Sequence, residues 1–302
     1  MDLIGFIENS SKNFVLESNV PTLAKTEPCM LGIDEAGRGP VLGPMVYAAA
    51  YCAVSQVDIL KRKGVADSKT LTEEKRENLF SLIDEASDMM GWIIEIHSPN
   101  VISNCMLRRS KYNLNALSHD SAIMLIKKAL DLGVNVTEVY VDTVGQPEKY
   151  QSKLSSIFPD LKITVAKQAD ATYPVVSAAS ICAKVARDNS LKSWKFAEGD
   201  SFQDIEYGSG YPNDPVTKKF LCNNIDPVFG FPQLVRFSWS TADKILQAQA
   251  VEVKWEEVDD ENSPKKSQNL LKFMSDGSQT KTAMPKSHSF FTQRNLHQTS
   301  NL

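Results

Sequence analysis

Short apolar runs that alternate with helical patterns are the feature that most limits how this chain can fold. Runs of strand length predict five strands, at residues 31–35, 41–54, 92–97, 137–142 and 161–167. Apolar residues at helical spacing predict helices at residues 73–90, 114–132 and 174–194, and further helices that begin near residues 147, 214 and 241. Three early strands followed by alternating helices and strands predict an α/β fold, layered around a sheet.

The composition divides the chain into four segments. Residues 1–27 are rich in turn formers and predict a peripheral N-terminal segment, whereas residues 28–210 carry the predicted strands and most of the helices. Residues 211–250 predict a helical C-terminal extension. Residues 251–302 begin with an almost purely acidic run and continue with Ser, Lys, Gln and Asn, so we predict a largely flexible tail, which is also a candidate partner-binding segment.

The charge and the cysteines of the chain limit which partners it can bind and in which compartment it can work. The 33 Lys and Arg residues are outnumbered by 37 Asp and Glu residues, so a surface for nucleic acid requires a local patch, bound cations or partner subunits. The five cysteines are scattered, which predicts a reducing compartment without disulfides or a zinc site. The N-terminus lacks a secretory pattern and no apolar run is long enough to cross a bilayer, so we expect no membrane association.

Four acidic residues stand where predicted strands end. Asp34 and Glu35 end the first strand, Asp142 ends the run Val-Tyr-Val, and Asp170 follows the last strand. Because open α/β sheets place their ligand sites at strand ends, we expect these acids to converge. Each acid is also explained as a helix cap or a solvated strand end, and the pattern alone does not decide between the two interpretations.

Carboxylates that converge repel one another, and they stay ionised only if cations neutralise them. Mg²⁺ or Mn²⁺ is the expected cation because both prefer oxygen ligands. Two such ions, about 3.5–4 Å apart, would hold the attacking water and the leaving oxygen of a phosphodiester displacement. The histidines have no HExxH or triad-like spacing, so His97 and His119 are interpreted as structural.

Two glycine-containing stretches and one lysine are candidate substrate contacts. Gly37, Arg38 and Gly39 allow backbone amides to approach a ligand closely, and such contacts can detect a ribose hydroxyl. Tyr211 stands in a glycine-flanked loop from which its ring can stack on a sugar or base. Lys69 carries a positive charge and is a candidate contact to a phosphate group. An ordinary tight turn and a packed loop tyrosine are the alternative interpretations of the two glycine stretches.

The predicted helix at residues 174–194 is apolar except for one stripe about 100° wide. A helix of this kind is buried, and its stripe faces either a cleft or a partner. A polar edge that reaches bulk water is the alternative. The stripe consists of Ser177, Ser180, Lys184, Arg187 and Asp188.

Long motifs at residues 32–44, 67–69, 112–120, 141–145, 169–188 and 207–215 together resemble one family. They are similar to the catalytic subunits of type 2 ribonucleases H, and the stretches at 112–120 and 208–215 favour the eukaryotic branch. The similarity extends over residues 28–245 almost without interruption. It implies an RNase H-like fold, a central mixed five-stranded sheet flanked by helices, with a helical C-terminal extension.

The resemblance also implies roles for individual residues. It assigns two Mg²⁺ or Mn²⁺ ions to Asp34, Glu35, Asp142 and Asp170, which are therefore the expected catalytic residues. It assigns recognition of the ribose 2′-hydroxyl to Gly37, Arg38 and Gly39, and stacking at the RNA-to-DNA junction to Tyr211. Its weaker implications concern Lys69, Asn113 and Arg187, as nucleic-acid contacts or local scaffolding.

The implied activity is endonucleolytic hydrolysis of the RNA strand of RNA/DNA hybrids, with cleavage 5′ of single ribonucleotides embedded in duplex DNA. The implied setting is nuclear, in a heterotrimer with two non-catalytic subunits, B and C, which the tail would help to hold. The pair Phe290 and Phe291 is alternatively interpreted as a sliding-clamp peptide.

Three other functions remain open from the residues alone. A two-metal nuclease or recombinase of the same fold class would act on DNA, and a non-catalytic scaffold would bind nucleic acid and merely retain the acids. A small-molecule phosphatase is the third, although the aromatic loop and the glycine stretch would then have no task.

Overall fold

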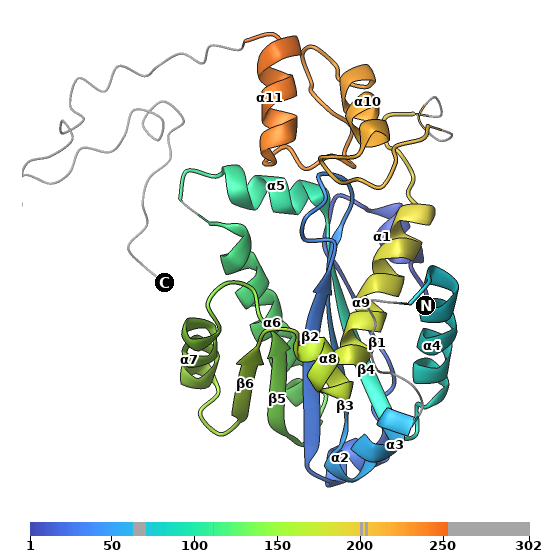
Figure 1. The fold of residues 1–302 in the computed structure, drawn as a ribbon, viewed down its shortest axis with the longest axis vertical. Coiled ribbons are helices and arrows are strands. Elements are labelled where there is room, and N and C mark those ends of the chain that lie inside the picture. Colours follow the sequence, from blue (N-terminus) through green and yellow to red (C-terminus); the bar gives the residue numbers. More distant parts are fainter. Residues whose placement is uncertain (63–70, 111, 200–201, 203–204, 253–302) are drawn as a thin grey trace, which may run out of the picture. The chain divides into compact units, whose positions relative to one another are not determined.

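A mixed six-stranded sheet forms the centre of the computed structural model, which describes residues 1–62, 71–110, 112–199, 202 and 205–252 (Figure 1). The strands are β1 (Phe14–Glu17), β2 (Cys29–Ala36), β3 (Met45–Ala53), β4 (Met90–His97), β5 (Val136–Asp142) and β6 (Lys162–Ala166). Their order across the sheet is β1-β4-β3-β2-β5-β6. The first three neighbouring pairs are antiparallel, whereas β2, β5 and β6 run parallel.

Helices cover both faces of this sheet (Figure 1). One face carries α1 (Ile4–Glu8), α3 (Val57–Arg62), α4 (Glu73–Glu85) and α9 (Pro174–Lys192). The opposite face carries α2 (Thr22–Thr26), α5 (Pro99–Leu107), α6 (Leu114–Asp131) and α7 (Pro147–Ile157). The remaining described elements are a 3₁₀ turn, η1 (Val54–Gln56), the short helix α8 (Ala169–Thr172), and α10 (Pro215–Asn223) and α11 (Ser240–Gln249).

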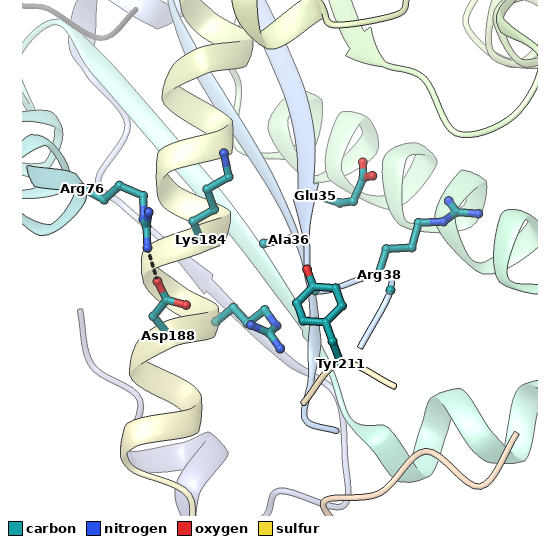
Figure 2. A pocket seen from close by; sticks show the side chains of 10 residues that line it. Glu35, Ala36, Arg38, Arg76, Lys184, Asp188 and Tyr211 are labelled. Carbon is teal, nitrogen blue, oxygen red and sulfur yellow. Dashed lines mark hydrogen bonds and ion pairs between the residues drawn. The ribbon is translucent and has the colours of Figure 1, made fainter. Parts of the chain in front are cut away.

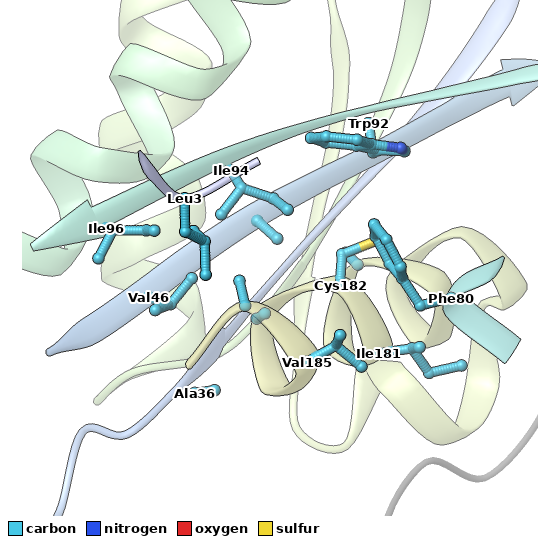
Figure 3. Close-up of a cluster of buried hydrophobic side chains, with 14 of the residues drawn as sticks. Leu3, Ala36, Val46, Phe80, Trp92, Ile94, Ile96, Ile181, Cys182 and Val185 are labelled. Atoms are coloured by element: carbon cyan, nitrogen blue, oxygen red, sulfur yellow. The ribbon is translucent and has the colours of Figure 1, made fainter. Parts of the chain in front are cut away.

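Alternation along β3 divides the core into two clusters. All nine residues of β3 are buried, and successive side chains point to opposite faces of the sheet. Val46 and Ala48 join the cluster under α9, whereas Tyr47 and Ala49 join the cluster under α6. Figure 3 shows the first cluster, in which Trp92, Ile94 and Ile96 of β4 face Phe80, Ile181, Cys182 and Val185 of the helices.

The buried helix predicted at residues 174–194 is α9, and it lies directly on β2. A Cβ atom added to Gly32 would stand 2.3 Å from the carbonyl carbon of Val175 and 2.4 Å from the nitrogen of Val176. Only a glycine permits this approach, since no other residue lacks a Cβ. The glycine therefore sets the helix-to-sheet distance beside the acidic pair at the end of β2.

The sheet has one strand more than the five expected. Phe14–Glu17, within the N-terminal segment expected to be peripheral, pairs antiparallel with Ile93–Ile96 of β4. The same segment buries Leu3 and Phe6 in the core. Four residues are too few for a period-two pattern to identify a strand, and only pairing along β4 makes this segment extended.

The second predicted strand begins later than expected, at Met45 rather than at residue 41. Gly43 has a φ of +81°, and Pro44 has no N–H to give to a ladder. The amides of Val41 and Leu42 instead donate to the carbonyl of Gly210, at 2.8 and 3.3 Å. Residues 41–44 therefore form a loop against Gly210, and the carbonyl of Val41 accepts a 2.8 Å hydrogen bond from the amide of Arg236 in the C-terminal extension.

The extension expected at residues 211–250 contains α10 and α11. Phe220, Leu221 and Ala242 bury their side chains in the cluster under α9. The predicted tail at residues 251–302 lies outside the described residues from Val253 onward. Among the described helices, none combines the length and apolar character that a bilayer crossing requires.

Candidate active site

The four predicted acids lie at one edge of the sheet. Asp34 and Glu35 are near the end of β2, and Asp142 is the last residue of the parallel neighbour β5. Asp170 lies in the first turn of α8, which follows β6, the parallel neighbour of β5. Because parallel strands end at the same edge, this topology brings together acids that are up to 136 residues apart in sequence.

Asp34 and Glu35 face opposite sides of the sheet because consecutive strand residues alternate. The Asp34 side chain is 5% exposed and shares a hydrogen bond with Ser180 of α9. It also accepts a 2.7 Å hydrogen bond from the amide of Glu35. Glu35 faces the side of Leu31 and Ile33, where α6 and α7 lie. The site therefore draws on both faces of β2.

Burial and mutual repulsion shift the pKa values of this acidic pair. Burial, followed by the charges of Asp142 and Asp170, raises the pKa of Asp34 to about 7, against the opposing effect of its hydrogen bond to Ser180. Burial, followed by the charges of Asp34 and Asp142, raises the pKa of Glu35 to about 8. These influences require the four carboxyl groups to lie within electrostatic reach of one another.

The segment that carries Asp170 is tied to the end of β5. The amide of Ala169 donates a 2.9 Å hydrogen bond to Oδ1 of Asp142. Gln168, just before it, has a φ of +55° and is the only described non-glycine residue in the left-handed region. This unusual backbone turns the chain sharply between β6 and α8, and it places Asp170 beside Asp142.

The glycine stretch after β2 fits closely against two other elements. Gly37 has a φ of +78°, and a Cβ there would stand 2.2 Å from Nε of Arg187. A Cβ on Gly39 would stand 3.3 Å from the ring of Tyr211. Between them, Arg38 donates from Nη1 to Oγ of Ser118 at 3.0 Å and from Nη2 to Oδ1 of Asn115. The stretch is therefore more than a simple tight turn, since it joins the candidate residues Arg187 and Tyr211.

Arg236 supports this stretch from below, and the sequence did not single it out. Its guanidinium is fully buried and donates to the carbonyls of Gly37 at 2.6 Å, Gly43 at 2.8 Å and Arg38 at 3.3 Å. Burial, and then the nearby charge of Arg187, lowers the pKa of Arg236 to about 9, so it remains protonated at neutral pH. No local pattern marks an arginine whose partners are almost 200 positions away.

Trp239 adds a second link from the extension. Its indole Nε1 donates a 3.0 Å hydrogen bond to the carbonyl of Gly39, and the Arg236 guanidinium lies 4.8 Å from its ring centre. The carbonyls of Gly37, Arg38, Gly39 and Gly43 all point towards the extension. The amide of Gly43 is bonded to the extension as well, since it donates to the carbonyl of Leu234 at 2.8 Å.

Tyr211 projects from a loop that is held by hydrogen bonds. Its side chain is 52% exposed, so it is not the packed loop tyrosine of the alternative interpretation. The Asp214 carboxylate accepts from the amide and the hydroxyl of Ser209, at 2.6 and 2.7 Å. Thr217 accepts from the amide of Gly210 at 2.9 Å. A rigid loop thus presents an exposed ring beside Gly39.

The polar stripe of α9 faces this site and not bulk water. Ser177 and Ser180 are buried, and Lys184, Arg187 and Asp188 line a pocket of about 350 Å³. Figure 2 shows Glu35 and Arg38 on one side of the strand end, and Lys184 and Asp188 on the other. The pocket is also lined by Ala36, Gly37, Gly39, Arg76 and Tyr211.

The remaining predicted residues have different surroundings. Lys69 lies outside the described residues. Asn113 is the N-cap of α6, where its Oδ1 accepts from the amide of Ala116 at 2.9 Å, so its side chain is engaged in scaffolding. His97 is buried between Ser121 and Glu95, whereas His119 stacks on Tyr150 with ring centres 3.8 Å apart. Neither histidine lines the pocket.

The residues at the sheet edge fit a divalent cation by the chemistry of their donors. Four carboxylates share a mostly buried edge, and Oε2 of Glu35 is buried with no hydrogen-bond partner. Within the described ranges, no three Asp, Glu, His or Cys side chains already converge on a single point as a complete ligand set would. Side chains such as Asp34 and Asp142 are instead held by hydrogen bonds within the protein.

The sheet order, the helices on both faces and the acidic edge are typical of nucleases with an RNase H-like fold. A family model described as ribonuclease HII matches residues 31–242. The A subunit of ribonuclease H2 from Bos taurus is 53% identical over 296 residues, which is 98% of this chain and 98% of that protein. The chain therefore belongs to the ribonuclease HII family and is an endonuclease of the ribonuclease H type.

Solved structures agree with this family. The ribonuclease H2 of Pyrococcus horikoshii OT3 is 32% identical, with a TM-score of 0.61 over 73% of this chain and 98% of that one. The ribonuclease HII of Archaeoglobus fulgidus, solved in a complex with PCNA, is 31% identical, with a TM-score of 0.54 over 64% of this chain and 85% of that one. The expected RNase H-like fold is thus confirmed, as is the resemblance of the sequence to type 2 ribonucleases H.

Proposed function

We propose that this endonuclease cuts the RNA strand of RNA/DNA hybrids and also cuts 5′ of a single ribonucleotide embedded in duplex DNA, leaving a 3′-hydroxyl and a 5′-phosphate. The observation that carries the proposal is the position of the four-acid edge beside the Gly37–Gly39 stretch. The four acids would bind the cations that hold the reacting phosphate. The glycine stretch would distinguish ribose from deoxyribose. Glu35, one of the four acids, and the glycine stretch line the same pocket.

Asp34, Glu35, Asp142 and Asp170 would hold two divalent cations, Mg²⁺ or Mn²⁺. When bound, the cations supply activation of the attacking water and stabilisation of the leaving oxygen. The chain's own contribution is to fix the carboxylates, through Ser180 for Asp34 and the Ala169 amide for Asp142. Lys184, Arg187 and Arg76 give the pocket a basic wall, which suits a phosphate backbone.

Recognition of the ribose is assigned to the amides of Gly37, Arg38 and Gly39. Their carbonyls are engaged by Arg236 and Trp239, so the peptide planes of the stretch are held in one orientation. Fixed peptide planes are suited to hydrogen bonding with a 2′-hydroxyl, which only RNA carries. Tyr211, exposed beside Gly39, would stack on the sugar that follows the ribonucleotide.

We further propose that the chain works in the nucleus, in a heterotrimer with two non-catalytic subunits, B and C. The relatives carry the name of one lettered component of ribonuclease H2, which supports an assembly of several different chains. The residues expected to contact the partners, at 251–302, lie outside the described residues except for the first two. The PCNA complex of the archaeal relative supports the sliding clamp as an additional partner, through Phe290 and Phe291.

The central test is cleavage of a duplex that carries one ribonucleotide in an otherwise DNA strand. The chain is co-expressed with subunits B and C, and the duplex is offered with Mg²⁺, with Mn²⁺, or with a chelator. We expect one incision 5′ of the ribonucleotide, dependence on the cation, and no cutting of an all-DNA control. An Asp142→Asn variant controls for contaminating nucleases. Cutting of the all-DNA control by the wild type but not by this variant would overturn the proposed specificity.

The role of the tail is tested separately. Removal of residues 251–302 should weaken assembly with subunits B and C, as measured by gel filtration and by titration of the purified subunits. An unchanged affinity would remove the tail from the partner interface.

A further inference from the structure

Glu35 and Tyr47 occupy directly opposed positions on neighbouring strands. The register of β2 and β3 pairs them, so both side chains point to the same face of the sheet. Opposed residues of an antiparallel pair have Cβ atoms about 4.5–5.5 Å apart. Tyr47 is 1% exposed, and its hydroxyl therefore lies in the interior beneath the acidic edge.

A second buried tyrosine approaches the same place from α7. Tyr150 is also 1% exposed and belongs to the same cluster as Tyr47. The charge of Glu35 acts on both phenols, which places both within electrostatic reach of its carboxylate. The ring of His119 stacks on the ring of Tyr150, with centres 3.8 Å apart and planes at 14°, and so holds it in place.

Polar atoms at this location are left without partners. The hydroxyl of Tyr150, Oε2 of Glu35 and Nε2 of His119 are buried without a hydrogen-bond partner. The hydroxyl of Tyr47 is also buried and has only Ser118 close by, at a geometry poorer than that of an ordinary hydrogen bond. Buried polar atoms without partners are rare, because each one costs about 1–3 kcal/mol of desolvation. Here four such atoms belong to four elements, β2, β3, α6 and α7, on the same face of the sheet.

We propose that Tyr47 and Tyr150 are positioning residues for Glu35, whose buried carboxylate oxygen accepts hydrogen bonds from their hydroxyls, directly or through one enclosed water. The inference rests on the proposed function, in which Glu35 is a cation ligand. A water in this space would find the two to four polar partners that an enclosed water needs.

The arrangement has a definite chemical consequence. Each phenol donates one O–H and is not itself charged, so the pair favours the ionised carboxylate without competing for a cation. Hydrogen bonds to the buried oxygen also leave the other oxygen of Glu35 turned towards the pocket that Glu35 lines. Partners of this kind commonly change metal affinity by roughly 10–100-fold.

The test removes single hydroxyl groups and keeps the rings. Tyr47→Phe, Tyr150→Phe and the double variant are purified without metal, and their binding of Mn²⁺ is measured by electron paramagnetic resonance. We expect each single variant to bind Mn²⁺ about tenfold more weakly than the wild type, and the double variant more weakly still. Cleavage of the one-ribonucleotide duplex should need a correspondingly higher concentration of cation, and saturating Mn²⁺ should restore much of the rate.

Tyr51→Phe provides a matched control. Tyr51 lies on β3 and faces the same side as Tyr47, and its hydroxyl is likewise buried, with only Ser18 close by. Leu31 and Gly91 oppose it, away from the acids. This variant should bind Mn²⁺ as the wild type does. Melting temperatures of all variants show that each one is folded.

Two outcomes would overturn the positioning role alone. One is unchanged Mn²⁺ affinity in both Tyr47→Phe and Tyr150→Phe, and the other is an equal loss of affinity in Tyr51→Phe. A wild-type protein that fails to bind Mn²⁺ would instead overturn the cation site itself, and the positioning role with it.

Discussion

Two adjacent acids on one strand that face opposite sides of a sheet define the site at the scale of single residues. Asp34 is held on the α9 side by Ser180, whereas Glu35 lies on the side of α6 and α7. A cation at the strand end would therefore be reached by carboxylates from both faces. The cost of this arrangement is repulsion in the absence of a cation, which is reflected in the raised pKa values of both groups.

This repulsion makes the stability of the metal-free protein depend on pH. Folding raises the pKa of Asp34 from 3.8 to about 7 and that of Glu35 from 4.5 to about 8, so the folded state binds protons more readily than the unfolded state. The stability that these groups contribute is complete below their ordinary pKa values and is lost as the pH rises through the raised ones. With a chelator present, we expect the melting temperature to fall between pH 6 and pH 9, and Mg²⁺ to restore it most at pH 9.

Neutralising one acid should relieve the repulsion. Asp34→Asn keeps an oxygen that can accept the hydrogen bond from the Glu35 amide, but it removes one negative charge. Without metal at pH 8.5, we expect this variant to melt roughly 2–6 °C above the wild type, at about 2–4 °C per kcal/mol for a domain of this size. Cleavage should be abolished. A variant that melts below the wild type at pH 8.5 but not at pH 5 would contradict the electrostatic account.

Tyr211 should matter for substrate and not for folding. Tyr211→Ala removes an exposed ring, so the free energy of unfolding should change by less than about 0.5 kcal/mol. Loss of stacking, worth about 1–3 kcal/mol, should lower kcat/KM on the one-ribonucleotide duplex by roughly 5- to 150-fold. Tyr211→Phe, which keeps the ring, serves as the control. Equal rates for the Ala variant and the wild type would exclude stacking.

At the scale of elements, the close packing of α9 against β2 determines whether the polar stripe of the helix reaches the acids. This close packing depends on the absence of a side chain at Gly32. The helix contributes Ser180 to Asp34, and also Lys184 and Arg187 to the pocket wall. A shift of the helix away from the strand would therefore disturb the acids and the basic wall together.

Gly32→Ala tests this dependence. A Cβ only 2.3 Å from backbone atoms of Val175 forces α9 to move, so we expect a loss of roughly 3 kcal/mol or more in the free energy of unfolding, together with reduced cleavage. Chemical denaturation measures the first effect. Gly133→Ala is the comparison, since its Cβ meets nothing within 4 Å and only its φ of +82° is strained, at about 1–2 kcal/mol. Similar losses in both variants would show that packing at Gly32 is not the cause.

At the scale of the whole molecule, the C-terminal extension contacts the candidate active site although it contributes none of the acids. Arg236 and Trp239 hold the backbone of the glycine stretch from distances of almost 200 residues along the chain. The extension also supplies Tyr211 and the loop that carries it. We therefore expect catalysis to depend on the sheet edge, and the choice of substrate to depend on how the extension meets that edge.

Replacement of Arg236 should therefore loosen the glycine stretch and lower stability. Arg236→Leu leaves the buried carbonyl of Gly43 and the partly buried carbonyls of Gly37 and Arg38 without their donor, and an unsatisfied buried group costs about 1–3 kcal/mol. We expect the free energy of unfolding to fall by roughly 3 kcal/mol or more, and discrimination between the one-ribonucleotide duplex and an all-DNA duplex to decrease. Lys219→Gln, on the exposed side of α10, should change neither quantity. Full discrimination in a folded Arg236→Leu protein would contradict this role.

The sequence by itself determined the five main strands, the buried helix and the family, because these depend on local periodicity and on long uninterrupted motifs. It also located the four acids at strand ends, since a strand and its last residue are neighbours in the chain. Only the tertiary structure decided that Phe14–Glu17 becomes a sixth strand, that Arg236 supports the glycine stretch, and that Tyr47 and Tyr150 lie behind Glu35. These features depend on contacts between residues distant in sequence, and no local pattern records which distant groups a buried side chain will meet.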